Sequence, residues 1–336
     1  MKKIIVAACM AAVLLLTALA GCSSGSSSST AASDASSSTS APADNDKKVL
    51  TIAQGGDITT FDMQNHNNGV TGAVLCNFSH GLVERADEDN AWVCVLAKSY
   101  EMIDDSTWEF KLRDDVTWHN GDPFTAADVK YTYERAATDE SLAENHIFKV
   151  IKEVQIIDDY TVRFATDGPY PTLLSLLSKN GSQVMPSKYI EENGLDYYLE
   201  HPIGCGPYQF KEWVKDNVVV LERYDDYFGG TPYWDEVRFR AIPEASTRVA
   251  ELLTGNVDII VNVPTNEWDR INTEENTEMV LGNGTRIYNV IMKWNTSPTQ
   301  NKQVREAVAY AIDAQTIIDT VLNVLHPYRS GRIRSG

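Results

Sequence analysis

The fold of this chain is decided by residues 203–258, which read IGCGPYQFKEWVKDNVVVLERYDDYFGGTPYWDEVRFRAIPEASTRVAELLTGNVD. Gly204, Gly206 and Pro207 predict a tight turn at the start, because glycine tolerates positive φ and proline fixes its own φ. Apolar and β-branched residues then alternate or cluster as they do in strands with one buried face. We expect three strands here, over residues 208–213, 218–223 and 237–239.

The second half of this stretch predicts a loop, a helix and a further strand. Residues 227–232 form the loop, since Gly-Gly-Thr-Pro interrupts helices and strands alike. Ser246 can cap the helix, and Gly255 stands where a C-terminal cap belongs. Residues 257–261 are typical of a short buried strand, so the predicted order is β-β-β-α-β.

These residues resemble the family 5 extracellular solute-binding proteins, which are the oligopeptide-, dipeptide- and nickel-binding receptors of ABC importers. The patterns that carry the resemblance are G-x-G-P-Y-x-F from Gly204, L-E-R-x-x-x-Y-x-G-G-x-P-Y-x-[DE]-x-V-x-F from Leu221, and I-P-[DE]-A-S-T-R-x-x-x-L-x-x-G-x-V-D from Ile242. Two further blocks match the family: VTWHNGDPFTAADVKYTYER over residues 116–135, and VREAVAYAID from Val304. A long and ordered match of this kind indicates common descent.

The resemblance implies an α/β fold of the periplasmic-binding-protein-like type II class, two-lobed, with mixed sheets, flanking helices and an incomplete last lobe. The expected divisions are lobe I over residues 49–75 and 183–280, an inserted lobe II over 76–182, the start of lobe III over 281–325, and an aberrant tail over 326–336. The family pattern stops after Leu322, and the tail is basic and without periodicity. We therefore expect a truncated chain that ends before a typical member does.

The N-terminus predicts export and lipid attachment. Residues 1–21 begin with two lysines and continue with an apolar run, as in a bacterial signal peptide. Leu-Ala-Gly-Cys ends at Cys22 and matches the lipobox, so we expect Cys22 to carry diacylglycerol. An ordinary signal peptide and a membrane anchor are the alternatives, but the run is short for a spanning helix. The Ser-rich residues 22–48 cannot bury enough surface to fold and should form a flexible tether.

The composition excludes several classes of function. The chain has 336 residues and a formal net charge of −18, which argues against nucleic-acid binding and against adhesion to anionic lipid through a basic face. Because the sequence has no phosphate loop, zinc-ligand pair or nucleophile elbow, we expect no catalytic residue, no metal site and no cofactor. Cys76, Cys94 and Cys205 remain beyond the signal, and three small buried residues are favoured over one bridge plus a free thiol. The family usually has Thr or Ser in place of Cys205.

His119 and Asp122 are the pair that a catalytic or metal-binding hypothesis would use. No second His or Cys stands at ligand spacing, and the surrounding residues are typical of a strand, a turn and a helix. Thr125 and Asp128 resemble a capping box at the start of that helix. We therefore favour a structural role for His119.

Three residues are candidates for the wall of a ligand cleft. Thr59 and Thr60 follow an opening strand over residues 50–53 and two glycines, which would let a ligand approach the backbone. Asn295 ends an expected strand over residues 287–295, where the resemblance places an Asn near the cleft. A plain turn and core packing are equally good explanations of these residues.

Elsewhere the spacing of apolar residues predicts further elements. These are a strand over residues 108–112, a hairpin over 154–157 and 161–165, helices over 173–177 and 303–312, and a helix capped by Asp313. The expected inner face of the helix over 303–312 includes Val304 and Val308.

The expected function is that of a lipid-anchored extracytoplasmic receptor of an ABC importer. It should be a monomer, held by Cys22 on the periplasmic side or outer surface of the cytoplasmic membrane, that delivers a solute to permease subunits by hinge closure. A peptide is the favoured solute, with nickel and sugars as alternatives. Two other functions stay open: a fragment without transport activity, because the last lobe would be incomplete, and an exported hydrolase lipoprotein that uses His119 or Asp122.

Overall fold

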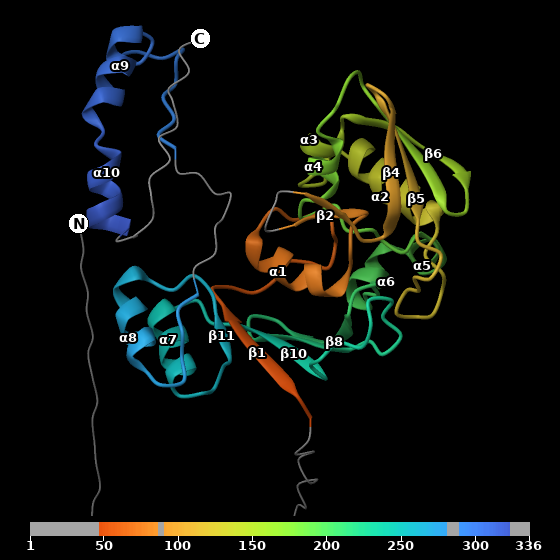
Figure 1. Cartoon of the computed structure of the whole chain (residues 1–336), viewed down its shortest axis with the longest axis horizontal. Helices are drawn as coiled ribbons and strands as arrows, with labels where there is room; N and C mark the ends of the chain where they lie inside the picture. Colours follow the sequence, from red (N-terminus) through yellow and green to blue (C-terminus); the bar gives the residue numbers. More distant parts are fainter. Residues whose placement is uncertain (1–46, 87–90, 281–288, 323–336) are drawn as a thin grey trace, which may run out of the picture. The chain divides into compact units, whose positions relative to one another are not determined.

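A mixed five-stranded sheet contains the stretch that decides the fold. The computed structural model describes residues 47–86, 91–280 and 289–322 (Figure 1). The strand order of this sheet is β11-β1-β10-β9-β8, and the strands are β1 (Val49–Gln54), β8 (Tyr208–Val214), β9 (Val218–Arg223), β10 (Glu236–Ala241) and β11 (Ile259–Ile260). β1 runs parallel to β10 and β11, whereas β8, β9 and β10 are antiparallel. Helix α7 (Ala245–Leu253) connects β10 to β11, so the predicted order β-β-β-α-β is confirmed.

Gly204 and Gly206 are required for a different reason from the predicted one. Neither residue has a positive φ. Their segment lies directly on the C-terminal end of α1 (Gly69–Phe78), where the Gly206 N–H donates to the Phe78 carbonyl at 2.9 Å. A Cβ on Gly204 would stand 2.0 Å from the Phe78 carbonyl oxygen, and one on Gly206 would stand 2.6 Å from the carbonyl carbon. Close backbone approach, and not turn geometry, explains both glycines.

The helix and the last strand of this stretch also differ from the prediction in detail. α7 begins after Glu244, so Ser246 lies inside the first turn and does not cap it. Gly255 has a φ of +73° just beyond the helix, as a C-terminal glycine should. β11 is a two-residue edge strand whose Ile259 side chain is exposed, whereas the sequence predicts a buried strand. Among the described strands only β1 pairs with β11, which leaves one side of β11 uncovered.

One apolar core lies between the five-stranded sheet and α1. Asn68 caps this helix, since its side chain accepts a hydrogen bond of 2.7 Å from the Thr71 N–H. The helix buries Val74, Leu75 and Phe78 against Val219, Leu221, Val237 and Phe239 of the sheet. Phe61, from the segment after β1, meets the Phe78 ring edge to face at 5.4 Å. The segment after β1 is thereby fixed to the core.

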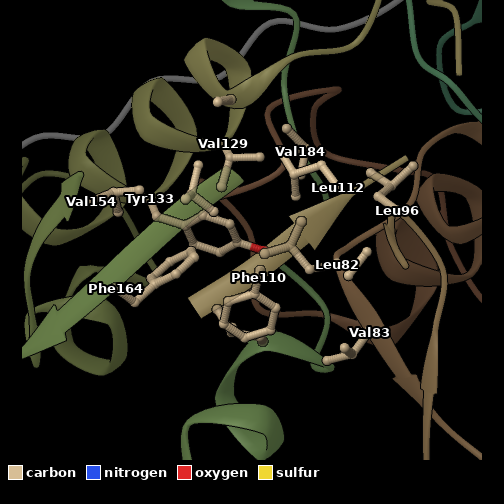
Figure 2. Close-up of a cluster of buried hydrophobic side chains, with 14 of the residues drawn as sticks. Leu82, Val83, Leu96, Phe110, Leu112, Val129, Tyr133, Val154, Phe164 and Val184 are labelled. Atoms are coloured by element: carbon tan, nitrogen blue, oxygen red, sulfur yellow. The ribbon is translucent and has the colours of Figure 1, made fainter. Parts of the chain in front are cut away.

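A second apolar core lies between α2 (Ala126–Thr138) and the antiparallel sheet β4-β5-β7-β6. The strands are β4 (Ala97–Asp104), β5 (Thr107–Leu112), β6 (Ile151–Asp158) and β7 (Thr161–Thr166), which confirms the predicted hairpin of β6 and β7. Figure 2 shows Val129 and Tyr133 of α2 among the side chains of this core. The Tyr133 ring meets Phe164 at 5.1 Å, and its hydroxyl donates to the Ser182 carbonyl at 2.7 Å.

The remaining elements up to residue 280 are short. They are β2 (Val83–Arg85), β3 (Trp92–Cys94), α3 (Asn145–Phe148), α4 (Leu173–Leu177), α5 (Ser187–Asn193), α6 (Leu195–Glu200), the 3-10 turn η1 (Thr265–Glu267) and α8 (Trp268–Thr273). The bounds of α4 match the helix predicted over residues 173–177. Within the described ranges, no helix is long and apolar enough to cross a membrane.

Two segments of the chain, at residues 79–80 and at residue 184, connect the two cores, and an ion pair between Arg135 and Asp62 joins them as well. The two segments are bonded to each other, since the Val184 N–H donates to the His80 carbonyl at 2.9 Å and the Ser79 hydroxyl donates to the Val184 carbonyl at 3.0 Å. Arg135 of α2 forms a fork with Asp62, with Nη1 to Oδ1 at 2.9 Å and Nη2 to Oδ2 at 2.6 Å. The segment after β1 is thus bonded to the second core as well as to the first.

The elements after residue 288 follow the prediction only in part. They are α9 (Lys302–Ala311), α10 (Ala314–Ile317) and the π-helical turn η2 (Ile318–Leu322). Asp313 caps α10 as predicted, because its side chain accepts a hydrogen bond of 3.0 Å from the Thr316 N–H. The expected inner face of α9 is not buried, since Val304 and Val308 are half-buried. Residues 289–295 form no strand, in contrast to the prediction. They pair with none of the described strands, so no sheet satisfies their backbone groups.

The three cysteines of the described ranges are free thiols. Cys205 is buried and Cys94 is half-buried, but Cys76 is exposed, which corrects the expectation of three buried residues. Position 76 lies on the side of α1 that faces away from the buried Val74 and Leu75. Cys22, the tether up to residue 46 and the tail over residues 326–336 lie outside the described residues.

Candidate ligand-binding site

Three parallel strands end at one edge of the five-stranded sheet. The segments that leave this edge are residues 55–56 after β1, 242–244 after β10 and 261–263 after β11. In open α/β sheets, ligands bind outside the carboxyl ends of the parallel strands, where the connecting segments diverge. These residues, together with Arg248 of α7, form the candidate site and are called the carboxyl edge below.

The guanidinium group of Arg248 holds two segments of the carboxyl edge together. Its Nη1 donates to the carbonyl oxygens of Ile242 at 2.7 Å and Pro243 at 2.9 Å, and its Nη2 donates to that of Asn262 at 3.4 Å. Arg248 is only 5% exposed, and its Nε is buried without a hydrogen-bond partner among the described residues. A buried donor of this kind is uncommon in folded proteins and marks this position as a candidate for function.

The segment after β1 lies against the same guanidinium. A Cβ on Gly55 would stand 3.5 Å from Arg248 Nη1, and Gly55 itself is exposed. A Cβ on Gly56 would meet no atom within 4 Å. The backbone of both glycines is therefore open to an approaching molecule, with a cationic group directly behind Gly55.

Thr59 and Thr60 lie beyond these glycines in a loop that is fixed by its own hydrogen bonds. The Thr59 N–H donates to the Thr71 hydroxyl oxygen at 3.0 Å, and the Thr60 hydroxyl oxygen accepts from the Asp62 N–H at 2.9 Å. Thr59 is exposed, whereas Thr60 is half-buried. The two threonines are therefore held in the loop that follows the carboxyl edge, and their contact with a ligand stays a prediction.

Asn295 lies in a turn and not at the end of a strand. Its side chain is exposed, and its Oδ1 accepts a hydrogen bond of 3.3 Å from the Thr296 hydroxyl. No hydrogen bond links it to Thr59 or Thr60 within the described part of the chain. Its place near a cleft also stays a prediction.

His119 and Asp122 do not interact as a catalytic pair. His119 is occupied by the entry segment of the sheet, because its Nδ1 accepts from the Gly204 N–H at 3.0 Å and its Nε2 donates to the Gly206 carbonyl at 3.1 Å. Burial lowers the pKa of His119 to about 4, which keeps the ring neutral for both bonds. Asp122 instead accepts from Lys188 Nζ at 2.9 Å. These bonds give His119 the structural role that the sequence predicts.

A hollow beside β11 is the main alternative to the carboxyl edge. It has a volume of about 450 Å³ and is lined by residues of α7, β11, α8 and the segment 276–280. Its charged lining residues, Asp258 and Glu278, are both acidic, and no cationic side chain lines it. Among the described residues that line it, there is thus no cationic group that would orient a polar solute. The carboxyl edge, which has such a group, is the better supported site.

Sequence reasoning missed Arg248, although it lies within one of the family patterns. The signal that could have found it is its position in the amphipathic helix. Arg248 precedes Val249 and stands four residues before Leu252, so it falls on the apolar stripe of α7. An arginine on such a stripe must be buried and must find acceptors. The identity of those acceptors depends on where β10 and β11 end, which helix periodicity does not reveal.

Comparison with known proteins gives one consistent result. The family model of the bacterial extracellular solute-binding proteins, family 5 Middle, matches residues 91–328. The glutathione-binding protein GsiB of Salmonella paratyphi A (strain ATCC 9150 / SARB42) is 30% identical over 274 residues, which are 81% of this chain and 53% of that protein. GsiB of Escherichia coli O1:K1 / APEC is 27% identical over the same length. The chain therefore spans about half the length of the curated relatives it matches.

Solved structures share the fold. The periplasmic binding protein DppA from Helicobacter pylori, in complex with the peptide STSA, aligns with a TM-score of 0.63 and 27% identity over 68% of this chain and 49% of that one. AgaA from A. tumefacien R10, in complex with agropinic acid, aligns with a TM-score of 0.69 and 26% identity over 83% of this chain and 58% of that one. The predicted mixed α/β fold of a periplasmic binding protein is confirmed by these matches.

Proposed function

Because the chain belongs to family 5 of the bacterial extracellular solute-binding proteins, we propose that it acts as the solute receptor of an ABC importer. The family consists of solute-binding proteins and not of enzymes. The observation that carries the proposal is the carboxyl edge, where exposed glycine backbone lies in front of the buried guanidinium of Arg248. A binding protein needs such polar groups in fixed positions and needs no reactive residue.

A peptide is the proposed solute. DppA was solved with a peptide, and the GsiB relatives are glutathione-binding proteins, so two of the matched proteins take peptide ligands. The exposed backbone of Gly55 and the half-buried backbone of Gly56 support the same class, because a peptide presents its own N–H and C=O groups to main-chain partners. Opine-like acids such as the ligand of AgaA are the alternative class.

We also propose that the receptor is attached to the membrane by lipid on Cys22 and works outside the cytoplasm with permease subunits. The lipobox that ends at Cys22 and the Ser-rich residues 22–48 support this part of the proposal. A tether of that composition would leave the globular part free to meet both solute and permease. Fatty-acid labelling in a bacterial host tests it: the chain should incorporate a tagged fatty acid, and Cys22→Ala should not.

Solute binding is tested by thermal shift and calorimetry with the purified Cys22→Ala chain. The panel consists of di- to pentapeptides, glutathione, agropinic acid, nickel–histidine and an oligosaccharide. We expect peptides to raise the melting temperature, since a ligand that binds only the native state stabilises it. Gly55→Leu should abolish the shift by covering the backbone in front of Arg248, whereas Ala250→Leu, at an exposed position of α7, should keep it.

The result separates the proposed receptor from its alternatives. Stabilisation by a non-peptide alone would change the solute class and keep the receptor. A cooperative melt that no solute in the panel shifts would favour a fragment without transport activity.

A further inference from the structure

Gln54 is a buried polar residue whose side chain has no hydrogen-bond partner in the described ranges. It is the last residue of β1 and is 3% exposed. Its backbone carbonyl accepts from the Ile242 N–H at 2.9 Å, whereas its side-chain amide is bonded to no described residue. A buried amide without a partner has lost its hydrogen bonds to water and gained none in return, which lowers the stability of the fold. An apolar side chain would avoid this cost, so the amide indicates a partner that comes from outside the described residues.

The position of Gln54 places this amide at the carboxyl edge. β1 lies between β10 and β11 and runs parallel to both, and Gln54 is followed directly by the exposed Gly55. Because side chains alternate along a strand, that of Gln54 lies on the same face of the sheet as Ile52, which packs against the core under α1. Arg248 lies against Gly55, the next residue in this alternation. A solute that rests on Gly55 therefore has a neutral amide within reach on the face that Arg248 does not occupy.

Asn262 supplies a second amide at the same edge. The parallel register pairs Ala53 with Ile260, so two residues further on Asn262 stands next to Gly55, where both segments leave the sheet. Its φ is +56°, which is uncommon for a residue other than glycine, and Arg248 Nη2 holds its carbonyl at 3.4 Å. Its side chain is exposed and is bonded to no described residue. Backbone strain of this kind is concentrated at sites that bind ligands, where it fixes the groups that make contact.

We infer that the carboxyl edge recognises an amide group of the solute through the side-chain amides of Gln54 and Asn262. This inference rests on the proposed function, because it names the group by which the same site selects its solute. A peptide bond presents one N–H donor and one C=O acceptor, and a side-chain amide offers the complementary acceptor and donors. An ester keeps the shape of a peptide bond but lacks the N–H, so it leaves the acceptor oxygen of a side-chain amide without its partner. Gln54 and Asn262 thereby become specificity-determining residues.

The test changes the solute and the protein together. The most tightly bound peptide of the thermal-shift panel is compared by calorimetry with its depsipeptides, in which each peptide bond is replaced in turn by an ester. We expect one ester to bind the Cys22→Ala chain about tenfold less tightly than the peptide. In the added double variant Gln54→Met, Asn262→Gly, the peptide and this ester should bind equally. Glycine at position 262 keeps both the positive φ and the carbonyl that Arg248 holds, so the backbone of the site is retained.

Matched controls separate this effect from a general change of the sheet. Asp216→Gly makes the same kind of substitution at the other non-glycine residue with positive φ in the described ranges. Gln209→Met removes a side-chain amide of β8 that is bonded to Glu222 at 3.3 Å. Both controls should keep the preference for the peptide over the ester. Without solute, Gln54→Met should raise the melting temperature, because it removes a buried amide that has no partner.

The results that would overturn the inference are distinguishable from a failure of the proposed function. If every ester binds as tightly as the peptide, if the double variant keeps the preference, or if only non-peptides of the panel bind, recognition of an amide is wrong while the receptor function stands. If no solute of the panel binds, the receptor function itself is contradicted, and the inference falls with it.

Discussion

Two arginines, Arg135 and Arg248, contact the segment after β1, at Asp62 and at Gly55 respectively, and they differ in their partners. Arg135 forms a two-bond fork with the carboxylate of Asp62 and donates a further bond of 2.6 Å to Gln64 Oε1. Among the described residues, Arg248 has carbonyl partners alone, and its Nε has no partner. The Arg135 side chain is 12% exposed and Arg248 is 5% exposed, so both guanidinium groups are largely removed from water. What distinguishes them is the partner, because Arg135 pairs with a carboxylate and Arg248 bonds neutral carbonyls.

The difference separates a structural ion pair from a candidate binding group. The charge of Arg135 is used within the protein, where it joins the second core to the segment after β1. The charge of Arg248 has no ion-pair partner among the described residues, and it lies at an edge where the Gly55 backbone is exposed. A buried cation whose partners are all neutral is therefore a candidate for ligand recognition.

The largest effect is expected when the ion pair is broken from one side. Arg135→Met should lower the free energy of unfolding by about 3–5 kcal/mol, because it leaves the buried Asp62 carboxylate without its partner. Urea unfolding measures the loss. Arg163→Met is the control, since Arg163 pairs with Glu109 at a half-exposed position and should cost less than about 1 kcal/mol.

The double variant Arg135→Met, Asp62→Leu sharpens this result. It should regain part of the lost stability, because it removes the stranded charge along with its partner. A double variant that is less stable by the full sum of the single losses would show that the pair does not act as a unit.

A smaller effect is expected for Arg248→Met. This change should cost about 2–3 kcal/mol, because the carbonyls of Ile242, Pro243 and Asn262 lose their donor while no charge is stranded. Arg240→Met, which breaks an ion pair with Glu251 on a more exposed side chain, should cost less. A loss as large as that of Arg135→Met would indicate an acidic partner for Arg248 and contradict the distinction drawn between the two arginines.

The contrast between these arginines also shows how far the sequence leads. The order β-β-β-α-β was predictable because strand periodicity, turn residues and helix signals agree within residues 203–258. The reason for Gly204 and Gly206 was not, because their neighbour Phe78 is more than a hundred residues away in the chain. The partners of Arg248 are close in the chain, but they are carbonyls just beyond the ends of β10 and β11, and the sequence does not fix where these strands end.

Prediction failed where an element depends on a partner that is not local. Residues 289–295 alternate like a strand but pair with none in the described part of the chain. β11 was expected to be buried from its apolar residues, but its place at the sheet edge leaves Ile259 exposed. Thr59 and Thr60 were proposed from their position after two glycines, and the structure adds the bonds that hold their loop.

His119 is buried like the two arginines, but it can lose its proton, so burial acts on its pKa. Burial lowers its pKa from 6.5 to about 4, so the unfolded chain takes up a proton between these values that the folded chain excludes. Stability should therefore fall by about 2 kcal/mol as the pH drops from 6.5 to 4. His119→Gln should be less stable at pH 7 and lack this dependence, whereas the exposed His146→Gln should keep it. Equal pH dependence in all three chains would show that His119 is protonated in the folded state.

The smallest effect on stability is expected at Glu236, a buried carboxylate that pairs with three cations. Lys47, Lys211 and Arg238 donate to it at 2.8, 2.7 and 2.6 Å, and its side chain is 2% exposed. Burial alone would raise the pKa of Glu236, but these bonds outweigh burial and lower it from 4.5 to about 2. Each cation is itself about a third to a half exposed, so removing one of them should lower the free energy of unfolding only slightly.

Because the pKa of Glu236 is lower in the folded state, its contribution to stability is present above pH 4.5 and lost as the pH falls towards 2. Urea midpoints at pH 7 and pH 3 should therefore differ less for Glu236→Gln than for the unchanged chain. Glu222→Gln is the matched control, since Glu222 forms no ion pair in the described ranges, and it should keep the full difference. If Glu236→Gln also keeps that difference, its three cations do not hold the carboxylate ionised. Positive charge is thus in excess both at Glu236 and at Arg248. The excess at Glu236 lies on three half-exposed cations that water screens, whereas the excess at Arg248 is buried.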